Sequence, residues 1–121
     1  MTLLTYLQDN LATLMKRRDR LALKAVRDAI SAIQNAETSY VTTPATVGAP
    51  SEFVAGAVGF GNSERVVKDL DDRQMMDLAR AEVTRRLDQS LHYRGLGDID
   101  RALTLKAEAL ALADKLDAYP G

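Results

Sequence analysis

Apolar residues recur at steps of three and four along four stretches of this 121-residue chain, and this spacing constrains the fold more than any other feature. In the first stretch, Leu4, Leu7, Leu11 and Leu14 follow these steps. Residues spaced in this way share one face of an α-helix. The sequence therefore predicts an all-α protein in which two helical hairpins form a four-helix bundle. The four helices are expected at residues 3–17, 20–37, 71–94 and 98–118.

The other three helices carry comparable apolar stripes, which are expected to form the core. Ile99, Leu103 and Leu110 lie beside the last stripe and widen it, so that this helix needs neighbours on two sides. Met15 and two methionines of the third helix are expected to fill the core as well. The three stripes are Leu23, Val26, Ile30 and Ile33; Met75, Met76, Ala79, Val83, Leu87 and Leu91; and Leu105, Ala109, Leu112 and Leu116.

Short polar side chains and one glycine mark the expected helix ends. Thr2, Asp19 and Asp98 can each accept a hydrogen bond from the free N–H groups at a helix start, and Asp71 with its acidic neighbour suits the start of the third helix. Gly95 is predicted to end the third helix in the left-handed conformation. No Gly or Pro interrupts residues 16–20, so one continuous helix over the first two stretches stays an alternative.

Residues 38–63 are rich in Gly, Pro and Thr and are predicted to form a long flexible loop inside a single domain spanning 1–121. Cysteine is absent, which excludes disulfides and thiolate sites and suits a cytoplasmic location. The N-terminal residues have no signal-peptide pattern, and no apolar run is long enough for a membrane span, so no membrane partner is expected. The oligomeric state is left open.

No catalytic residue, metal site or cofactor is predicted. His92 is the only histidine, and without a second histidine or a cysteine a zinc site would need an improbable set of carboxylates. The acidic residues that adjoin one another lie at predicted helix starts, where the helix dipole favours them, and no pair is placed for acid and base catalysis.

Basic residues gather around the junction of the first two helices. On a regular helix Arg20, Lys24 and Arg27 project within a sector of about 60°, and Arg17 and Arg18 come just before them. Such a cluster can meet a phosphate backbone, although the net charge of −1 gives the whole chain no attraction for nucleic acid. The alternative is an ordinary solvated face, with Asp28 offsetting the charge beside it.

Asn35 and Glu37 close the second helix with polar side chains. They are candidates for contact with a ligand or partner. The alternative is that they cap the helix and bond to the following segment, in which case their substitution lowers stability rather than binding.

The run from Leu11 to Glu37 resembles the GatB/YqeY family, the helical tail of the tRNA-dependent amidotransferase B subunit and its free-standing relatives. A second similarity lies in the later helices, where Tyr93-Arg94-Gly95 precedes Asp98 and a helix rich in Leu, Ala and Glu. The longer family members continue into a further small helical domain, whereas this sequence ends after Tyr119 and Pro120. The matching residues of the first run are Met15-Lys16, Arg18-Asp19, Leu21, Leu23, Val26-Arg27, Ala32-Ile33, Asn35 and Glu37.

The resemblance implies a non-catalytic adaptor that holds tRNA, linked to a glutamine-dependent amidotransferase, a carbon–nitrogen ligase. It implies tRNA or an amidotransferase or translation-related protein as partner, and it supplies no active site. The alternative is a general protein-interaction module without RNA binding, since residues 93–112 also loosely imitate one tetratricopeptide helix pair. An independent enzyme is the third hypothesis.

Overall fold

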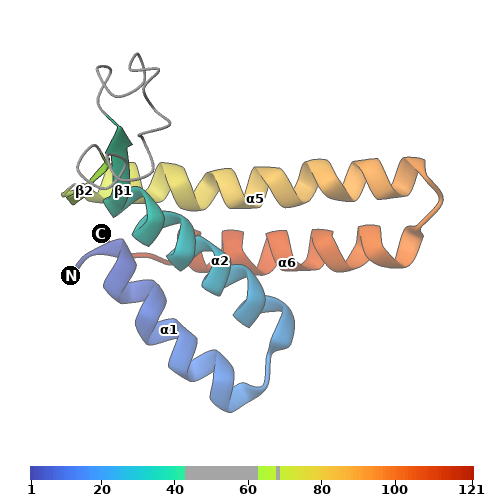
Figure 1. Cartoon of the computed structure of the whole chain (residues 1–121). Coiled ribbons are helices and arrows are strands. Elements are labelled where there is room, and N and C mark those ends of the chain that lie inside the picture. Colours follow the sequence, from blue (N-terminus) through green and yellow to red (C-terminus); the bar gives the residue numbers. More distant parts are fainter. Residues whose placement is uncertain (43–62, 68) are drawn as a thin grey trace, which may run out of the picture. The chain divides into compact units, whose positions relative to one another are not determined.

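The computed structural model describes residues 1–42, 63–67 and 69–121. Each predicted helix is present and lies within one residue of its expected bounds, and the all-α four-helix arrangement is confirmed (Figure 1). A break at residues 18–19 separates the first two helices, so the alternative of one continuous helix is wrong. The helices are α1 (Leu3–Arg17), α2 (Arg20–Glu37), α5 (Asp72–Gly95) and α6 (Ile99–Asp117).

The two ends of the predicted loop form a small ribbon. Strands β1 (Thr38–Thr42) and β2 (Ser63–Val67) pair in antiparallel fashion, with Thr38 opposite Val67. The assignment of residues 38–42 to a flexible loop was therefore wrong. Both strands contain β-branched residues, which favour extended backbone, and the neighbouring glycines and prolines masked this signal. The rest of the predicted loop, residues 43–62, lies outside the described residues.

The chain groups into two compact units. One comprises Met1–Ile33 and Leu70–Gly121 and is called the helical unit below. The other, Gln34–Asp69, contains the last turn of α2 and the ribbon. The core described next belongs to the helical unit, and so do the basic residues around the α1–α2 junction.

The core of the helical unit consists of the predicted stripes and the alanines between them. The small side chains Ala25 and Ala29 are fully buried and permit close helix approach. The expectation was wrong for Met15, which is 53% exposed, and for Leu91, which is 66% exposed. The buried cluster contains Leu3, Leu7, Leu14, Ala22, Ala25, Val26, Ala29, Ile30, Ile33, Met75, Ala79, Val83, Ala109, Leu112 and Leu116.

Helix starts follow the predicted caps. The side chains of Thr2 and Asp98 accept hydrogen bonds from the backbone three residues later, and Asp19 accepts one from the N–H of Ala22 at 3.2 Å. Asp71 forms a full capping box with Gln74, because each side chain bonds to the backbone of the other residue. These bonds fix where each helix begins.

Helix α5 ends differently from the prediction. It continues through Gly95, and Gly97 instead takes the positive φ, at 84°. The N–H of Asp98 donates to the carbonyl of Tyr93 at 2.9 Å, and the N–H of Gly97 donates to Arg94 at 3.1 Å. This pair of bonds is a Schellman motif, in which the residue that follows the C-cap adopts the left-handed conformation. Here Leu96 is the C-cap and Gly97 is the left-handed residue. Either glycine avoids the Cβ penalty, so the sequence could not distinguish them.

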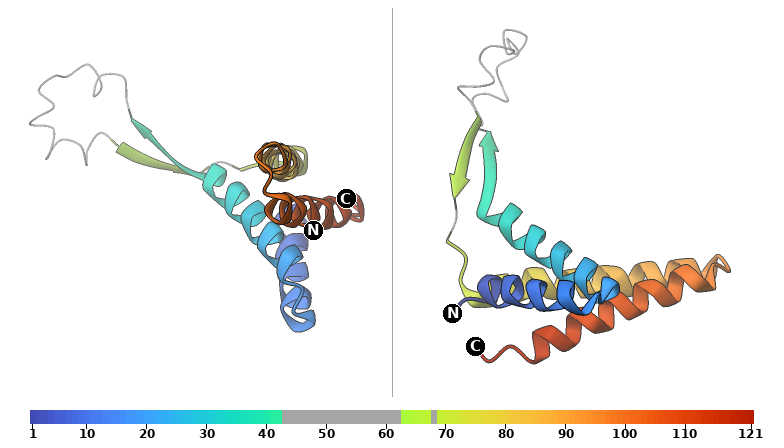
Figure 2. Two further views of the ribbon diagram at one scale, coloured as in Figure 1. Left: turned by 90° about the vertical axis from the view of Figure 1, so that its right-hand side faces the viewer. Right: turned by 90° about the horizontal axis from the view of Figure 1, so that it is seen from below.

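Helices α5 and α6 run in opposite directions and pack against each other, while α1 and α2 lie on one side of this pair (Figure 2). The buried hydroxyl of Ser90 donates to the carbonyl of Ala102 at 2.6 Å and ties the two helices together near the turn. No helix among the described residues has the length and apolar content needed to span a membrane.

Candidate functional site

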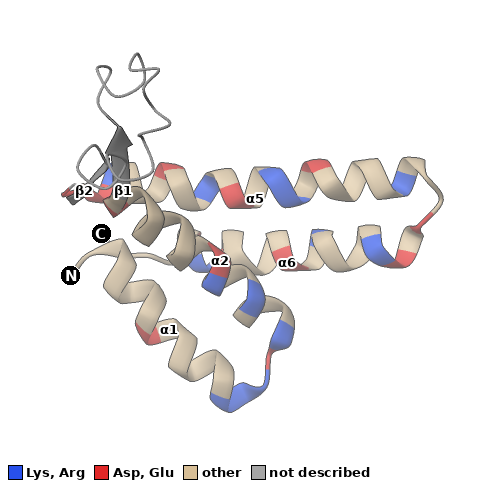
Figure 3. Cartoon of the chain, viewed as in Figure 1, with Lys and Arg blue, Asp and Glu red and all other residues tan. Residues whose placement is uncertain are grey.

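The predicted basic residues lie around the junction of α1 and α2, where Figure 3 shows several backbone segments coloured as Lys or Arg. All of them are exposed. We call this set the basic corner. It consists of Arg17, Arg18, Arg20, Lys24 and Arg27.

The backbone turn between the helices positions the first members of the basic corner. Arg18 adopts the left-handed conformation, with φ of 56°, and the N–H of Asp19 donates back to the carbonyl of Leu14 at 3.1 Å. This is a second Schellman motif, here closed by an arginine rather than a glycine. Because the carboxylate of Asp19 caps α2, it is held at the helix start amid the surrounding cations.

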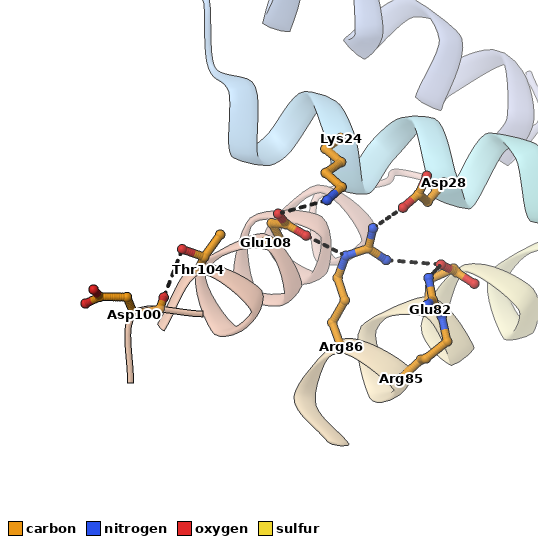
Figure 4. A network of polar contacts seen from close by, with 8 residues as sticks. All are labelled: Lys24, Asp28, Glu82, Arg85, Arg86, Asp100, Thr104 and Glu108. Carbon is orange, nitrogen blue, oxygen red and sulfur yellow. Dashed lines mark hydrogen bonds and ion pairs between the residues drawn. The ribbon is translucent and has the colours of Figure 1, made fainter. Parts of the chain in front are cut away.

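A buried arginine lies behind the basic corner, at the meeting point of three helices (Figure 4). Arg86 of α5 is only 2% exposed. Its Nε donates to Glu108 of α6 at 3.1 Å, and one terminal nitrogen donates to Glu82 at 3.0 Å. The other terminal nitrogen donates to Asp28 of α2. We call these four residues the Arg86 cluster.

The Arg86 cluster combines one guanidinium with three carboxylates, and Lys24 and Arg85 bring further cations to Glu108 and Glu82. Burial acts to lower the pKa of Arg86, but hydrogen bonds to Asp28, Glu108 and Glu82 outweigh it and raise the pKa above its usual range. Burial likewise acts to raise the pKa of Glu82, but hydrogen bonds from Arg85 and Arg86 outweigh it and hold this pKa below its usual value. Arg86 and Glu82 therefore both keep their charges in neutral solution.

The Arg86 cluster affects the charge of the basic corner. Asp28 was considered as the acid that offsets Arg27, yet its carboxylate binds Arg86 instead. Glu108 also bonds to Arg86, and its second oxygen lies 3.9 Å from the ammonium of Lys24, whose side chain is 67% exposed. Arg86 thus shares one positive charge among its acidic partners, so Asp28 and Glu108 are neutralised only in part from within the protein, and Lys24 also faces Glu108.

An open pocket of about 600 Å³ adjoins the corner at Lys24. It also contains Tyr93, over whose ring the guanidinium of Arg101 lies at 4.9 Å from the centroid. Asp98 and Asp100 contribute acidic groups on its α6 side. The mixed charge of this pocket does not point to a single ligand class.

Asn35 and Glu37 lie in the last turn of α2. They belong to the unit Gln34–Asp69 and not to the helical unit. Asn35 is exposed and Glu37 is half-buried. Thr38 closes this turn by donating its hydroxyl to the carbonyl of Gln34 at 2.9 Å. The basic corner is therefore formed without these two residues.

A second polar cluster joins distant parts of the helical unit at the start of α5. Asp72 accepts a hydrogen bond from the N–H of Leu3 at 3.0 Å and another from the hydroxyl of Tyr119. The bond from Tyr119, followed by that from Leu3, lowers the pKa of Asp72, and the same bond raises the pKa of Tyr119 to about 12. Tyr6 packs its ring 5.0 Å from that of Tyr119.

Sequence analysis missed the Arg86 cluster, although a signal was present. The buried line of α5 runs through Met75, Ala79 and Val83, and a step of three from Val83 leads to Arg86. The predicted stripe instead takes a step of four to Leu87. A charged residue on an apolar line indicates a buried ion pair, and Glu82 one turn earlier supplies a partner.

Among the residues that the structure describes, no group of three or more His, Asp or Glu side chains is arranged to hold a metal ion. His92 is exposed, and its ring centroid lies 5.5 Å from that of Tyr93. Comparisons with protein-family models, with curated proteins and with solved structures found no match to this chain.

Proposed function

We propose that this protein is a non-catalytic helical adaptor of GatB/YqeY type that binds tRNA through the basic corner. The observation that supports it most is the exposure of all five cations of the basic corner, two of which lie beside acids that also bond to Arg86. The resemblance in the Leu11–Glu37 run supplies the family and the class of RNA. In this proposal the chain acts in the cytoplasm as an auxiliary part of a glutamine-dependent amidotransferase, a carbon–nitrogen ligase.

The proposed contact is with phosphates rather than with bases. Arginine and lysine on exposed helix surfaces bind phosphate oxygens and release counterions, so binding weakens as salt rises. Each phosphate contact contributes about 0.7 to 0.9 to the slope of log affinity against log salt. Arg20 and Lys24 lie one turn apart on α2 and are suited to successive contacts.

Filter binding of tRNA between about 50 and 300 mM salt tests this proposal. The double variant Arg20→Ala/Lys24→Ala should reduce the slope by about 1.4 to 1.8, the loss of two phosphate contacts. A matched control, Arg73→Ala/Arg94→Ala, removes two exposed cations of α5 and should leave the slope unchanged. Superimposable curves for the wild type and the Arg20/Lys24 variant would refute the proposal.

A protein-interaction module without RNA binding is the second candidate. The observation that favours it is the set of exposed apolar residues on α5 and α6, including Leu91 and Leu103. The same filter assay separates the two functions, because such a module retains no tRNA even at about 50 mM salt.

A further inference from the structure

Large apolar side chains remain exposed on the α5–α6 pair, at positions where the sequence led us to expect a neighbouring helix. Leu91 of α5 is 66% exposed, and on α6 Leu103 is 60% exposed and Leu110 is 51% exposed. Ile99 at the start of α6 is 48% exposed. Isolated exposed leucines are common, but a contiguous group of them indicates an interaction surface.

These residues share one face. At about 100° per residue, Ile99, Leu103, Lys106 and Leu110 fall within a sector of about 60° on α6. From Ile99 to Leu110 the stripe is three turns long, or about 16 Å. We call this stripe, together with Leu91 and Arg94 of α5, the hairpin face.

A groove lies in the hairpin face between α5 and α6. It encloses about 280 Å³ and combines apolar surface with two cationic side chains. The hydroxyl of Ser90 in its floor already donates to the carbonyl of Ala102. The groove is lined by Ser90, Arg94, Ile99, Ala102, Leu103 and Lys106.

The charge of the groove is of one sign. Arg94 and Lys106 are both exposed, and no acidic residue of the described chain is among its lining residues. This contrasts with the pocket beside Lys24, where acids and bases alternate. An occupant of the groove must therefore offer apolar side chains to the floor and carboxylates to the rim.

We propose that the hairpin face binds an amphipathic helix of a partner protein whose apolar stripe is flanked by Asp or Glu. A helix laid along the groove can place its leucines against Leu91, Leu103 and Leu110, as in other helix-in-groove complexes. Its flanking carboxylates then reach Arg94 and Lys106. This binding is independent of the basic corner and of RNA.

The same charges disfavour a second copy of this chain as the occupant. A second copy of this chain would bring its own Arg94 and Lys106 to the contact, and like charges that meet across an interface are unfavourable. The acidic helix is the occupant that satisfies both the apolar and the charged groups.

The test uses two synthetic helical peptides that share one leucine stripe, with glutamates flanking it in one peptide and lysines in the other. Fluorescence anisotropy with the full chain should show tighter binding of the glutamate peptide. Arg94→Glu/Lys106→Glu should reverse this preference, whereas the control Lys16→Glu/Arg73→Glu should keep it. Nuclear magnetic resonance of the labelled chain should place the shifted amides on residues 91–110.

Leu103→Ser should weaken the glutamate peptide by roughly tenfold, as expected for the loss of one leucine from an apolar contact. Leu21→Ser, which alters a 39% exposed leucine of α2, is the matched control and should change nothing. Since both side chains are exposed, both variants should keep their helical circular dichroism. The proposal is overturned by equal binding of the two peptides, by a dimer that Leu103→Ser dissociates, or by binding to anionic vesicles that Leu103→Ser abolishes.

Discussion

Replacement of Arg86 by methionine tests whether the Arg86 cluster holds three helices together. The substitution keeps an unbranched apolar chain but removes the charge that faces Glu108, which is 3% exposed. The remaining cation near Glu108 is the ammonium of Lys24, at 3.9 Å. Removal of one partner from a buried ion pair costs about 3 to 5 kcal/mol, because the other charge is left without compensation. We expect Arg86→Met to lose stability of this size.

This loss is large for a chain of 121 residues. Single domains typically have a free energy of unfolding of about 5 to 15 kcal/mol, so the expected loss is a large fraction of the stability of the protein. Urea unfolding followed by circular dichroism at pH 7 gives the free energy directly. The melting temperature should fall by about 10 °C or more.

Two further variants separate the cluster from ordinary packing. Arg85→Met removes the neighbouring arginine, whose side chain is 49% exposed, and should cost less than about 1 kcal/mol. Arg86→Met/Glu108→Leu removes the uncompensated charge as well and should regain at least half of the loss. Equal stabilities for Arg86→Met and Arg85→Met would refute the reasoning.

The Arg86 cluster also predicts that the stability of the protein depends on pH in the acidic range. Because the arginines hold the pKa of Glu82 below its usual 4.5, this carboxylate stabilises the folded state above that pH, and the contribution disappears as pH falls through the lower folded value. Urea unfolding from pH 7 to pH 3 should therefore show a smaller loss of stability in Arg86→Met than in the wild type. An unchanged pH dependence would mean that Arg86 does not act on Glu82.

Three other predictions concern single positions. The pKa of Tyr119 is raised to about 12, so the neutral phenol stabilises the fold below pH 10 and this contribution is lost as pH rises toward 12. Tyr119→Phe should remove this loss of stability at alkaline pH. It should also remove the last step in a titration of tyrosinate absorbance. Arg18→Gly should relieve about 1 kcal/mol of left-handed strain, partly offset by the greater freedom of the unfolded chain, so it should unfold at a urea concentration no lower than Arg18→Ala. Leu112→Ala should cost about 2 to 5 kcal/mol because Leu112 is fully buried, whereas Leu110→Ala, at a half-exposed position, should cost far less in the same unfolding assay.

The helices were predictable because local spacing and caps determine them. The period of Leu4, Leu7, Leu11 and Leu14 and the cap residue Asp19 gave α1 and the start of α2 without any tertiary information. The ribbon was missed because its two strands are separated by 20 residues of sequence. Pairing across such a distance leaves no periodic signal in the sequence.

The basic corner was predictable in its residues but not in its electrostatic setting. Helical spacing brought Arg20, Lys24 and Arg27 together, since they belong to one helix. The neutralisation of Asp28 depends on Arg86, which lies 58 positions away, and only the tertiary packing reveals which arginine is buried. The exposure of Leu91 was unpredictable for the same reason. A stripe of apolar residues in the sequence does not show whether another helix packs against it.

The bonds that Asp72 makes bear on the order in which the protein folds. Its carboxylate joins Leu3, 69 positions earlier, to Tyr119, 47 positions later. Closing such long loops is entropically costly until other contacts have reduced the freedom of the chain, whereas the turn between α5 and α6 closes a short one. We therefore expect the antiparallel helix pair to form early and the first turn of α1 to dock last. In native-state hydrogen exchange, the amide of Leu3 should then become accessible through a partial opening that leaves the α5–α6 amides protected.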